Sequence, residues 1–502
     1  CIWAYIPALS GGFVFDDYSN IFNNDLLKID QFSFEDLLQA SMSTDTGPLR
    51  RPVAMFSFAI QHVLTGMDAW WMKLTNLLIH LFNGLLVLLV SRQLYRRCAS
   101  EDKPKPAIVP YFLTAIWLVH PINVTAVSYI IQRMTSLSAM FVLLAIYCYL
   151  KLREGAFEDW RKYLLSISIL FLWLLGMLTK ETAILLSIYI FVIEWCLYGF
   201  KASPKSEGKH LIILWALLAA PWVCALLFSI YDASFLLNEY EFREFSALER
   251  VYTEFRVMID YFRFTLIPDI RYMGLYHDNI VISQSLLSPI STLLSLLSII
   301  GLLVLAIGVK KTAPLFCLGI LWFFGGHVLE SSIYPLEIKF FHRNYLPSIG
   351  LLLAATEVGL GLYRHNRVLI TMMALLILLG FSISTRFLNH QWSADFRMQI
   401  LEVINNPGSI RANYRAGQIY SDLAIASKLE FERLAYRREA TRYFGNIRKL
   451  DPQNIAGELS ILESHLRYRE TPPYQLMRDL SQSISMVPIT FGITNIFQSI
   501  TR

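Results

Sequence analysis

Long apolar runs recur along the chain and alternate with shorter polar stretches. About eleven of them approach the roughly 20 residues that a helix needs to cross the hydrocarbon core of a bilayer. They lie at residues 1–11, 74–91, 107–121, 134–150, 163–179, 182–199, 210–230, 286–309, 313–330, 345–362 and 367–386. The pattern predicts an all-α fold, a polytopic helical membrane protein with about 11 transmembrane helices in residues 1–386.

The composition supports this class. The chain has 502 residues, of which 55% are hydrophobic and 17% are charged. Soluble domains carry about a quarter charged residues, so the composition excludes an ordinary soluble protein. The net charge of +5 is modest, and no basic block is dense enough to bind nucleic acid. We therefore expect a membrane protein without a nucleic-acid partner.

Basic residues concentrate on alternate loops, at residues 92–105, 151–162, 201–209, 310–311 and 364–367. The positive-inside rule makes these loops cytoplasmic. The first loop (12–73), the large loop (231–285) and the C-terminal region then lie on the extracytoplasmic side. Short loops favour a bacterial inner membrane, with this side in the periplasm. The chain begins at Cys1 within an apolar run, so we also expect part of a first helix to precede it.

The C-terminal region, residues 387–502, differs in composition from the rest of the chain. Residues 407–470 are charged, helical in pattern and nearly free of long apolar runs. Ala440, Phe444 and Pro452 have the spacing of the second helix of a tetratricopeptide repeat. We expect a small extracytoplasmic α-helical domain that resembles one interrupted repeat. A helical hairpin of no particular family is the alternative.

Two adjacent carboxylates, Asp16 and Asp17, follow the first apolar run. They could be solvated interface residues or a helix cap. They could also act in chemistry at the membrane surface, because a general base needs one ionised carboxylate within reach of an incoming hydroxyl group. Both interpretations remain open from the residues alone.

A polar stripe interrupts the apolar run that begins at residue 74. Asn76, His80 and Asn83 are spaced i, i+4 and i+7, so they share one face of a helix. Interhelical hydrogen bonding is the simpler explanation of this stripe. The spacing is not that of a dedicated metal site.

Ionisable residues also mark the other predicted outer loops. Lys180 and Glu181 lie between two apolar runs at a hairpin tip, and Arg133 has the equivalent position between two earlier runs. Cations at the membrane face could neutralise a lipid phosphate. Further candidates are Arg256 and Arg263, seven residues apart on an amphipathic segment, and Glu337, His342 and Arg343 in a dense charge cluster.

Several motifs resemble the transmembrane and tetratricopeptide-repeat-containing O-mannosyltransferases and their bacterial relatives. They include "FVFDDYSNIFNND", "RRPVAMFSFAIQHVLTG", "NLLIHLFNGLLV", "HPINVTAVSYIIQRMTSLSAMF", "LLGMLTKETAILL" and "FHRNYLPSIG", in order through most of residues 10–350. The resemblance implies a C-type glycosyltransferase (GT-C) fold with a catalytic first loop. It places the acidic pair at Asp16–Asp17. It assigns donor binding to Arg51, Arg133, Lys180, Glu181, Arg256, Arg263 and Arg343.

The resemblance implies an inverting glycosyltransferase that moves a sugar from a polyprenyl-phosphate-linked donor to a hydroxyl group, commonly on a protein. A divalent metal is a possible cofactor, and no other cofactor is expected. An oligosaccharyltransferase and a lipid-modifying glycosyltransferase of the same fold are alternatives. A non-catalytic transporter of lipid-linked sugars, or an assembly scaffold, is an alternative from another class.

Overall fold

The structure is a computed structural model that describes residues 1–99, 106–154, 158–201, 208–232, 238–363, 365–468 and 470–484. Parts of the predicted basic loops and of the large outer loop lie outside these residues. The described residues form helices and connecting segments without a β-strand. They divide into a membrane unit, Cys1–Met273 with Val281–Ser393, and a tail unit, Gly274–Ile280 with Ala394–Arg502.

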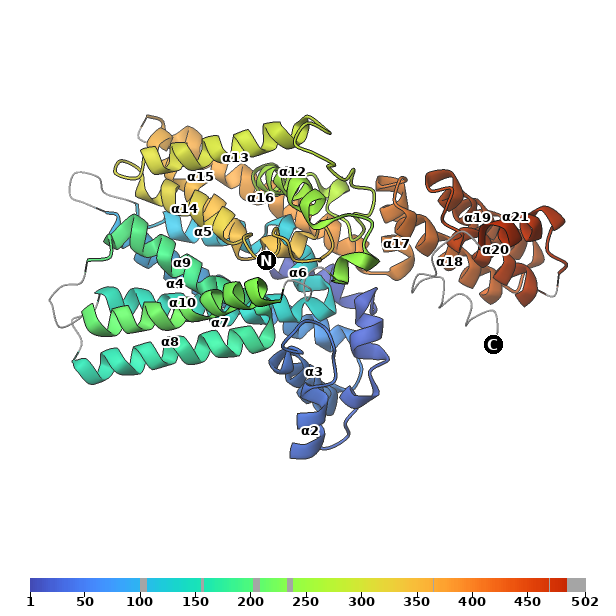
Figure 1. Cartoon of the computed structure of the whole chain (residues 1–502), viewed down its shortest axis with the longest axis horizontal. Coiled ribbons are helices and arrows are strands. Elements are labelled where there is room, and N and C mark those ends of the chain that lie inside the picture. Colours follow the sequence, from blue (N-terminus) through green and yellow to red (C-terminus); the bar gives the residue numbers. More distant parts are fainter. Residues whose placement is uncertain are drawn as a thin grey trace. The chain divides into compact units, whose positions relative to one another are not determined.

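The α-helices of the membrane unit differ widely in length (Figure 1). They are α1 (Ile2–Tyr5), α2 (Phe34–Ser41), α3 (Pro52–Thr65), α4 (Ala69–Arg97), α5 (Val109–Leu118), α6 (Val124–Ser128), α7 (Arg133–Glu154), α8 (Asp159–Thr179), α9 (Leu186–Ile193), α10 (Gly208–Tyr231), α12 (Ala247–Leu266), α13 (Ser291–Gly308), α14 (Pro314–Gly325), α15 (Pro347–Tyr363) and α16 (Arg367–Gln391). Short 3-10 turns at Ile130–Gln132, Glu181–Leu185 and Phe341–Asn344 precede α7, α9 and α15.

The predicted class, an all-helical membrane protein, is confirmed. Within the described ranges, seven helices are long and apolar enough to cross a bilayer, or eight if the bent pair Val109–Leu118 and Pro121–Ser128 is one span. The predicted spans at 313–330 and 345–362 correspond to shorter helices, α14 and α15. They are shorter because the charged stretch between Gly325 and Pro347 forms turns instead of continuing either helix.

The polar stripe of α4 is buried and joins α4 to its neighbours. Asn76 Nδ2 donates to the Ile130 carbonyl at 3.1 Å, and Asn83 Nδ2 donates to the Ser136 carbonyl at 2.8 Å. His80 Nδ1 lies 2.8 Å from the Tyr345 hydroxyl. The two asparagine bonds fix the start of α7 beside α4, and the His80 contact joins α4 to Tyr345, just before α15.

The tail unit consists of α17 (Asp395–Asn405), α18 (Ile410–Ala426), α19 (Glu430–Leu450), α20 (Ala456–Arg467) and α21 (Tyr474–Ile484). Helices α18 and α19 approach closely, since a Cβ atom at Gly417 would lie 2.5 Å from the Phe444 ring. The loop segment Gly274–Ile280 belongs to this unit. Glu402 Oε1 accepts the Leu275 amide at 2.6 Å and Oε2 accepts the Tyr276 amide at 3.4 Å. The repeat-like character of the tail remains a prediction.

Candidate functional site

One short stretch, residues 129–135, joins the first loop to the hairpin tips. It comprises the turn Ile130–Gln132 and the first residues of α7, and it is about 10 Å long at the rise of helical residues. It contacts Asp16 through Tyr129, Asp17 through Ile131, Arg51 through Met134 and Lys180 through Thr135. Side chains from distant parts of the sequence therefore meet along this stretch.

The two carboxylates of the first loop have different surroundings. Asp17 is fully buried, and its oxygens accept the amides of Val14 at 3.0 Å and Ile131 at 2.7 Å. Burial raises the pKa of Asp17 to about 7, although both amides oppose the shift. The Asp16 side chain is only half-buried, and the Asp16 amide donates to the Tyr129 hydroxyl at 2.9 Å. Asp17 thus anchors the loop, whereas Asp16 is accessible.

The backbone is strained beside both first-loop candidates. Phe15, which precedes Asp16, has a φ of 43°, and Arg50 and Arg51 have φ values of 55° and 47°. Left-handed conformations of residues other than glycine cost roughly 1–2 kcal/mol each and cluster at functional sites. The local sequence therefore does not favour the conformations that orient Asp16 and Arg51. Long-range contacts such as the Asp16–Tyr129 bond maintain them.

Arg51 connects the first loop to a hairpin tip. Its Nη2 and Nε atoms each lie 3.1 Å from Glu181 Oε2, and the two side chains are 15% and 20% exposed. Gly47 packs against the same carboxylate, because a Cβ atom there would lie 2.1 Å from Glu181 Oε1. Arg51 and Glu181, each predicted to bind the donor, therefore form an ion pair that holds residues 47–51 against the tip.

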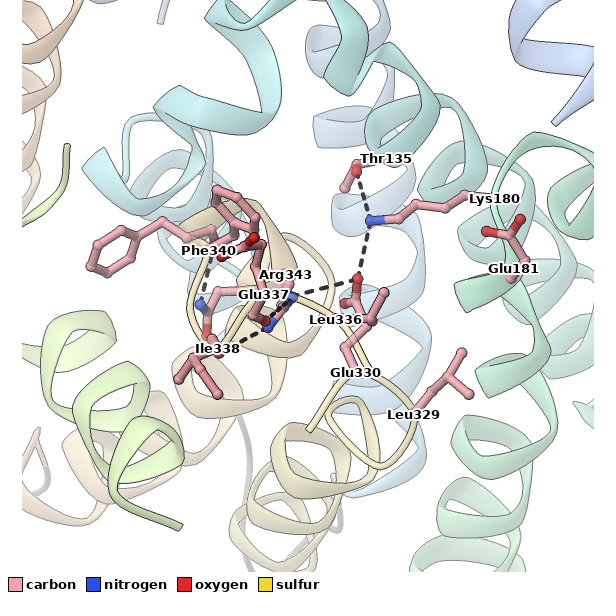
Figure 2. Close-up of polar contacts among 12 residues, drawn as sticks. Thr135, Lys180, Glu181, Leu329, Glu330, Leu336, Glu337, Ile338, Phe340 and Arg343 are labelled. Atoms are coloured by element: carbon pink, nitrogen blue, oxygen red, sulfur yellow. Dashed lines mark hydrogen bonds and ion pairs between the residues drawn. The ribbon is translucent and has the colours of Figure 1, made fainter. Parts of the chain in front are cut away.

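Lys180, Glu330 and Arg343 form a buried charge network (Figure 2). Lys180 Nζ lies 3.2 Å from Glu330 Oε1 and donates to Thr135 Oγ1 at 3.2 Å. Arg343 Nε lies 3.9 Å from the same Glu330 oxygen. Burial lowers the pKa of Lys180. Burial alone would raise the pKa of Glu330, but Lys180 and Arg343 hold it below its ordinary value.

Helix α12 contributes a second ion pair to this network. Arg250 Nη2 lies 3.0 Å from Glu254 Oε1, and both side chains are fully buried. Arg250 also donates to the Glu330 carbonyl at 2.7 Å, and Arg343 Nη1 lies 4.0 Å from Glu254. Burial raises the pKa of Glu254 to about 7. With Lys180, the network contains three cations and two carboxylates, 3 − 2 = +1, a charge suited to an anion.

A small polar cavity of about 30 Å³ adjoins the network. Its lining includes Lys180, Glu330, His342 and Arg343. It has room for about one water molecule, and neither carboxylate of the first loop lines it. The site therefore has an accessible acid at one end of the 129–135 stretch and a buried cationic network at the other.

The remaining predicted residues contact other groups. Arg133 is buried, and it donates to Asn76 Oδ1 at 2.8 Å and to Gln61 Oε1, so it joins α7 to α3 and α4. Arg256 donates to the Val281 carbonyl at 2.7 Å. Arg263 is exposed, and its guanidinium carbon lies 4.3 Å from the Phe264 ring centroid.

Two members of the predicted charge cluster also differ from each other. His342 is buried and stacks on Phe340, with ring centroids 5.1 Å apart. Glu337 is 36% exposed and pairs with Arg243 at 3.0 Å.

Sequence reasoning did not select Arg250 or Glu254 as site residues, although their i, i+4 spacing on α12 is a signal for an ion pair.

A divalent metal remained possible from the sequence. Across the described ranges, no three His, Cys, Asp or Glu side chains come close enough together to hold a metal ion. The described residues of the site thus do not form a set of metal ligands of these four types.

No protein-family model matches the chain. A protein O-mannosyl-transferase of Caenorhabditis elegans is 22% identical over 475 residues, which cover 89% of this chain and 61% of that protein. The protein O-mannosyl-transferases Tmtc3 and Tmtc2 of Drosophila melanogaster are 29% and 31% identical over 30% and 36% of this chain. These matches cover 18% and 19% of the fly proteins, so the chain spans only part of each relative's length.

Among solved structures, the apo crystal structure of ArnT from Cupriavidus metallidurans matches 95% of this chain and 88% of its own, with 12% identity and a TM-score of 0.44. The resemblance expected from the motifs is confirmed: the chain is similar to a protein named as a protein O-mannosyl-transferase over 89% of its length and to two others over about a third of it.

Proposed function

We propose that the chain is an integral membrane glycosyltransferase of the C-type fold. It transfers a sugar from a polyprenyl-phosphate-linked donor to a hydroxyl group of a protein, on the extracytoplasmic face of the membrane. The observation that carries the proposal is the 129–135 stretch, about 10 Å long, which contacts the accessible Asp16 through Tyr129 at one end and Lys180 of the cationic network through Thr135 at the other. The similarity to protein O-mannosyl-transferases supports the same activity.

The cationic network provides the proposed donor phosphate site. Lys180, Arg250 and Arg343 outnumber Glu254 and Glu330 by one charge, so a phosphate diester would relieve the repulsion among the cations. The adjoining cavity of about 30 Å³ is too small for a sugar phosphate. Donor binding must therefore widen the site next to His342 and Arg343.

An apolar groove supports a donor that carries a lipid chain. The groove has a volume of about 520 Å³ and is lined by residues of α5, α15 and α16, with Thr265 and Leu266 at the end of α12. Its lining is almost entirely hydrophobic, which suits an isoprenoid chain within the bilayer. Helix α12 links the two regions, because its other end carries the Arg250–Glu254 pair of the network.

In the proposed reaction, Asp16 hydrogen-bonds the acceptor hydroxyl group. The hydroxyl oxygen attacks the anomeric carbon while the bond from that carbon to the phosphate oxygen breaks. The leaving polyprenyl phosphate takes the electron pair of this bond, and Lys180 and Arg343 stabilise its growing charge. The hydroxyl proton passes to Asp16 late in the step, because an alcohol is a much weaker acid than a carboxylic acid. Single displacement inverts the configuration at the sugar carbon.

Activity assays on the purified protein test the proposal. Labelled polyprenyl-phosphate mannose is incubated with the protein in nanodiscs, and label is counted separately in protein and lipid fractions. We expect label in acceptor protein, with no loss on addition of a chelator. Label confined to lipid would instead identify a lipid-modifying enzyme. Movement of the donor across the bilayer without any transfer would contradict the enzymatic proposal.

A further inference from the structure

The end of the membrane bundle opposite the candidate site contains a second, separate concentration of charge. Helix α4 begins near the first loop and has 29 residues, so its two ends are about 40 Å apart. At its far end, a hollow of about 550 Å³ is lined mainly by Arg96, Arg97, Arg153, Glu154, Tyr198 and Lys201. These six residues are called the cation pocket below.

Buried contacts fix the wall of the cation pocket. Arg153 Nε lies 2.7 Å from Glu194 Oε1, and the two side chains are 6% and 0% exposed. Glu194 also accepts the Tyr149 hydroxyl at 2.5 Å, and that hydroxyl accepts Trp215 Nε1 at 2.9 Å. The guanidinium of Arg153 is thereby fixed where α7 meets the turn Glu194–Tyr198.

An aromatic ring holds a second arginine next to the first. The guanidinium carbons of Arg153 and Arg97 lie 4.5 and 5.0 Å from the centroid of the Tyr198 ring. Arg153 Nη2 also donates to the Lys201 carbonyl at 2.9 Å, which brings Lys201 to the same rim. Stacking on the aromatic face orients the guanidinium of Arg97 without occupying its N–H groups, whereas Nε and Nη2 of Arg153 are already paired with Glu194 and the Lys201 carbonyl.

The pocket has more positive than negative charge. Glu194 neutralises Arg153, which leaves Arg96, Arg97 and Lys201 against Glu154, 3 − 1 = +2. Basic residues in a loop can serve only to orient the protein in the membrane, and for that role they need not line one shared cavity. Here they come from α4, α7 and the end of the turn Glu194–Tyr198 and line one space, so their mutual repulsion falls when an anion enters.

We propose that the cation pocket is a binding site for a phosphate group, distinct from the proposed donor site and at the opposite end of the bundle. Arginine forks bind phosphate oxygens in a bidentate manner, and basic pockets between membrane helices bind anionic headgroups. The phosphate group could belong to a membrane lipid or to a soluble phosphate compound, and the two arms of the experiment distinguish these sources.

The lipid arm uses the full chain in nanodiscs that contain phosphatidylcholine with or without phosphatidylglycerol. Native mass spectrometry counts the lipids that remain bound after release from the discs. We expect the wild type to retain phosphatidylglycerol in preference to phosphatidylcholine. Since one basic residue near the headgroups contributes roughly a five-fold preference, R96Q/R97Q should lower the enrichment about ten-fold or more. R96K/R97K retains the charge and should retain most of the enrichment.

The control K310Q/K311Q removes the same charge from another basic loop and should bind phosphatidylglycerol like the wild type.

The soluble arm measures the unfolding temperature in detergent with inorganic phosphate and with pyrophosphate. Stabilisation of the wild type but not of R96Q/R97Q in this arm alone identifies a soluble phosphate as the ligand. The proposal is overturned if neither arm separates R96Q/R97Q from the wild type, or if K310Q/K311Q loses as much binding. K201Q, at the pocket rim, provides a second test if R96Q/R97Q does not fold.

Discussion

Asp17 accepts a hydrogen bond from the backbone amide of Ile131 at 2.7 Å, across 114 residues of sequence. Together with the Val14 amide, this bond occupies both oxygens of a fully buried carboxylate. The bond attaches the first loop to the start of α7, and it leaves the neighbouring Asp16 as the accessible acid. The two aspartates are therefore expected to respond differently to substitution.

The first prediction concerns Asp17→Asn. An asparagine has one acceptor oxygen, and its amino group would face an amide donor, so one hydrogen bond is lost inside the protein. The free energy of unfolding should fall by about 1–3 kcal/mol, which thermal unfolding in detergent would detect. Asp25→Asn is the control, because the Asp25 side chain is 89% exposed. An unchanged unfolding temperature of Asp17→Asn would contradict an anchoring role.

The second prediction concerns the centre of the buried charge network. Glu330→Gln would leave Lys180 and Arg343 in a buried site without their shared carboxylate. Breaking a buried ion pair by removing one partner costs about 3–5 kcal/mol of unfolding free energy. Glu337→Gln, at a 36% exposed side chain, should change it by less than about 1 kcal/mol. Equal effects of the two substitutions in chemical denaturation would show that the network is not buried as described.

The third prediction concerns the contact between the first loop and the hairpin tip. Arg51→Ala, Glu181→Ala and the double variant form a mutant cycle on a largely buried ion pair. We expect a coupling energy of about 1 kcal/mol in unfolding free energy. The same cycle on Arg271 and Asp269 should give a smaller coupling energy, because Arg271 is 70% exposed. If the effects of Arg51→Ala and Glu181→Ala on the unfolding free energy simply add, the ion pair does not hold the first loop against the hairpin tip.

The fourth prediction concerns the pH dependence of the tail unit. Burial raises the pKa of Glu402 from 4.5 to about 7, although the amides of Leu275 and Tyr276 oppose the shift. The folded tail thus binds a proton more tightly than the unfolded chain. The contribution of Glu402 to the stability of the tail is greatest below pH 4.5 and falls as the pH rises to 7, by up to about 3 kcal/mol.

Hydrogen exchange of the Leu275 amide, corrected for its intrinsic rate, measures this effect. Protection should decrease between pH 5 and pH 8 in the wild type. In Glu402→Gln, whose side chain does not titrate, the decrease should be much smaller. An identical pH dependence in both proteins would remove Glu402 as its cause.

Hydrophobic periodicity predicted most of the membrane helices, because their apolar surface is a local property of the sequence. The same reasoning selected Arg256 and Arg263 on α12 as residues that meet lipid headgroups, and it did not select the buried pair Arg250 and Glu254. Arg256 and Arg263 share a face that looks solvated, and charged residues are assigned to such faces by default. The buried face carries Arg250 and Glu254 instead. They can be buried because they pair with each other and lie next to Arg343. The contact with Arg343 is distant in sequence, so the local pattern of residues could not predict it.

The adjacent aspartates show the same limit at a smaller scale. Nothing in "FVFDDYSN" distinguishes Asp16 from Asp17. The difference arises from the positive φ of Phe15 and from the Ile131 amide, both of which depend on how distant segments pack. Arg133 shows the same limit. Its position at the start of α7 follows from the apolar runs, but its partners Asn76 and Gln61 lie on other helices, and the local sequence does not predict them.

The central claim is that Asp16 acts as the base next to a cationic site for the donor phosphate. The most direct test is the initial rate of sugar transfer from polyprenyl-phosphate mannose by Asp16→Asn, with Asp25→Asn as the matched control in the same loop. We expect transfer by Asp16→Asn to fall at least about 100-fold, with an unfolding temperature equal to that of the wild type. A rate for Asp16→Asn equal to that of Asp25→Asn would contradict the account.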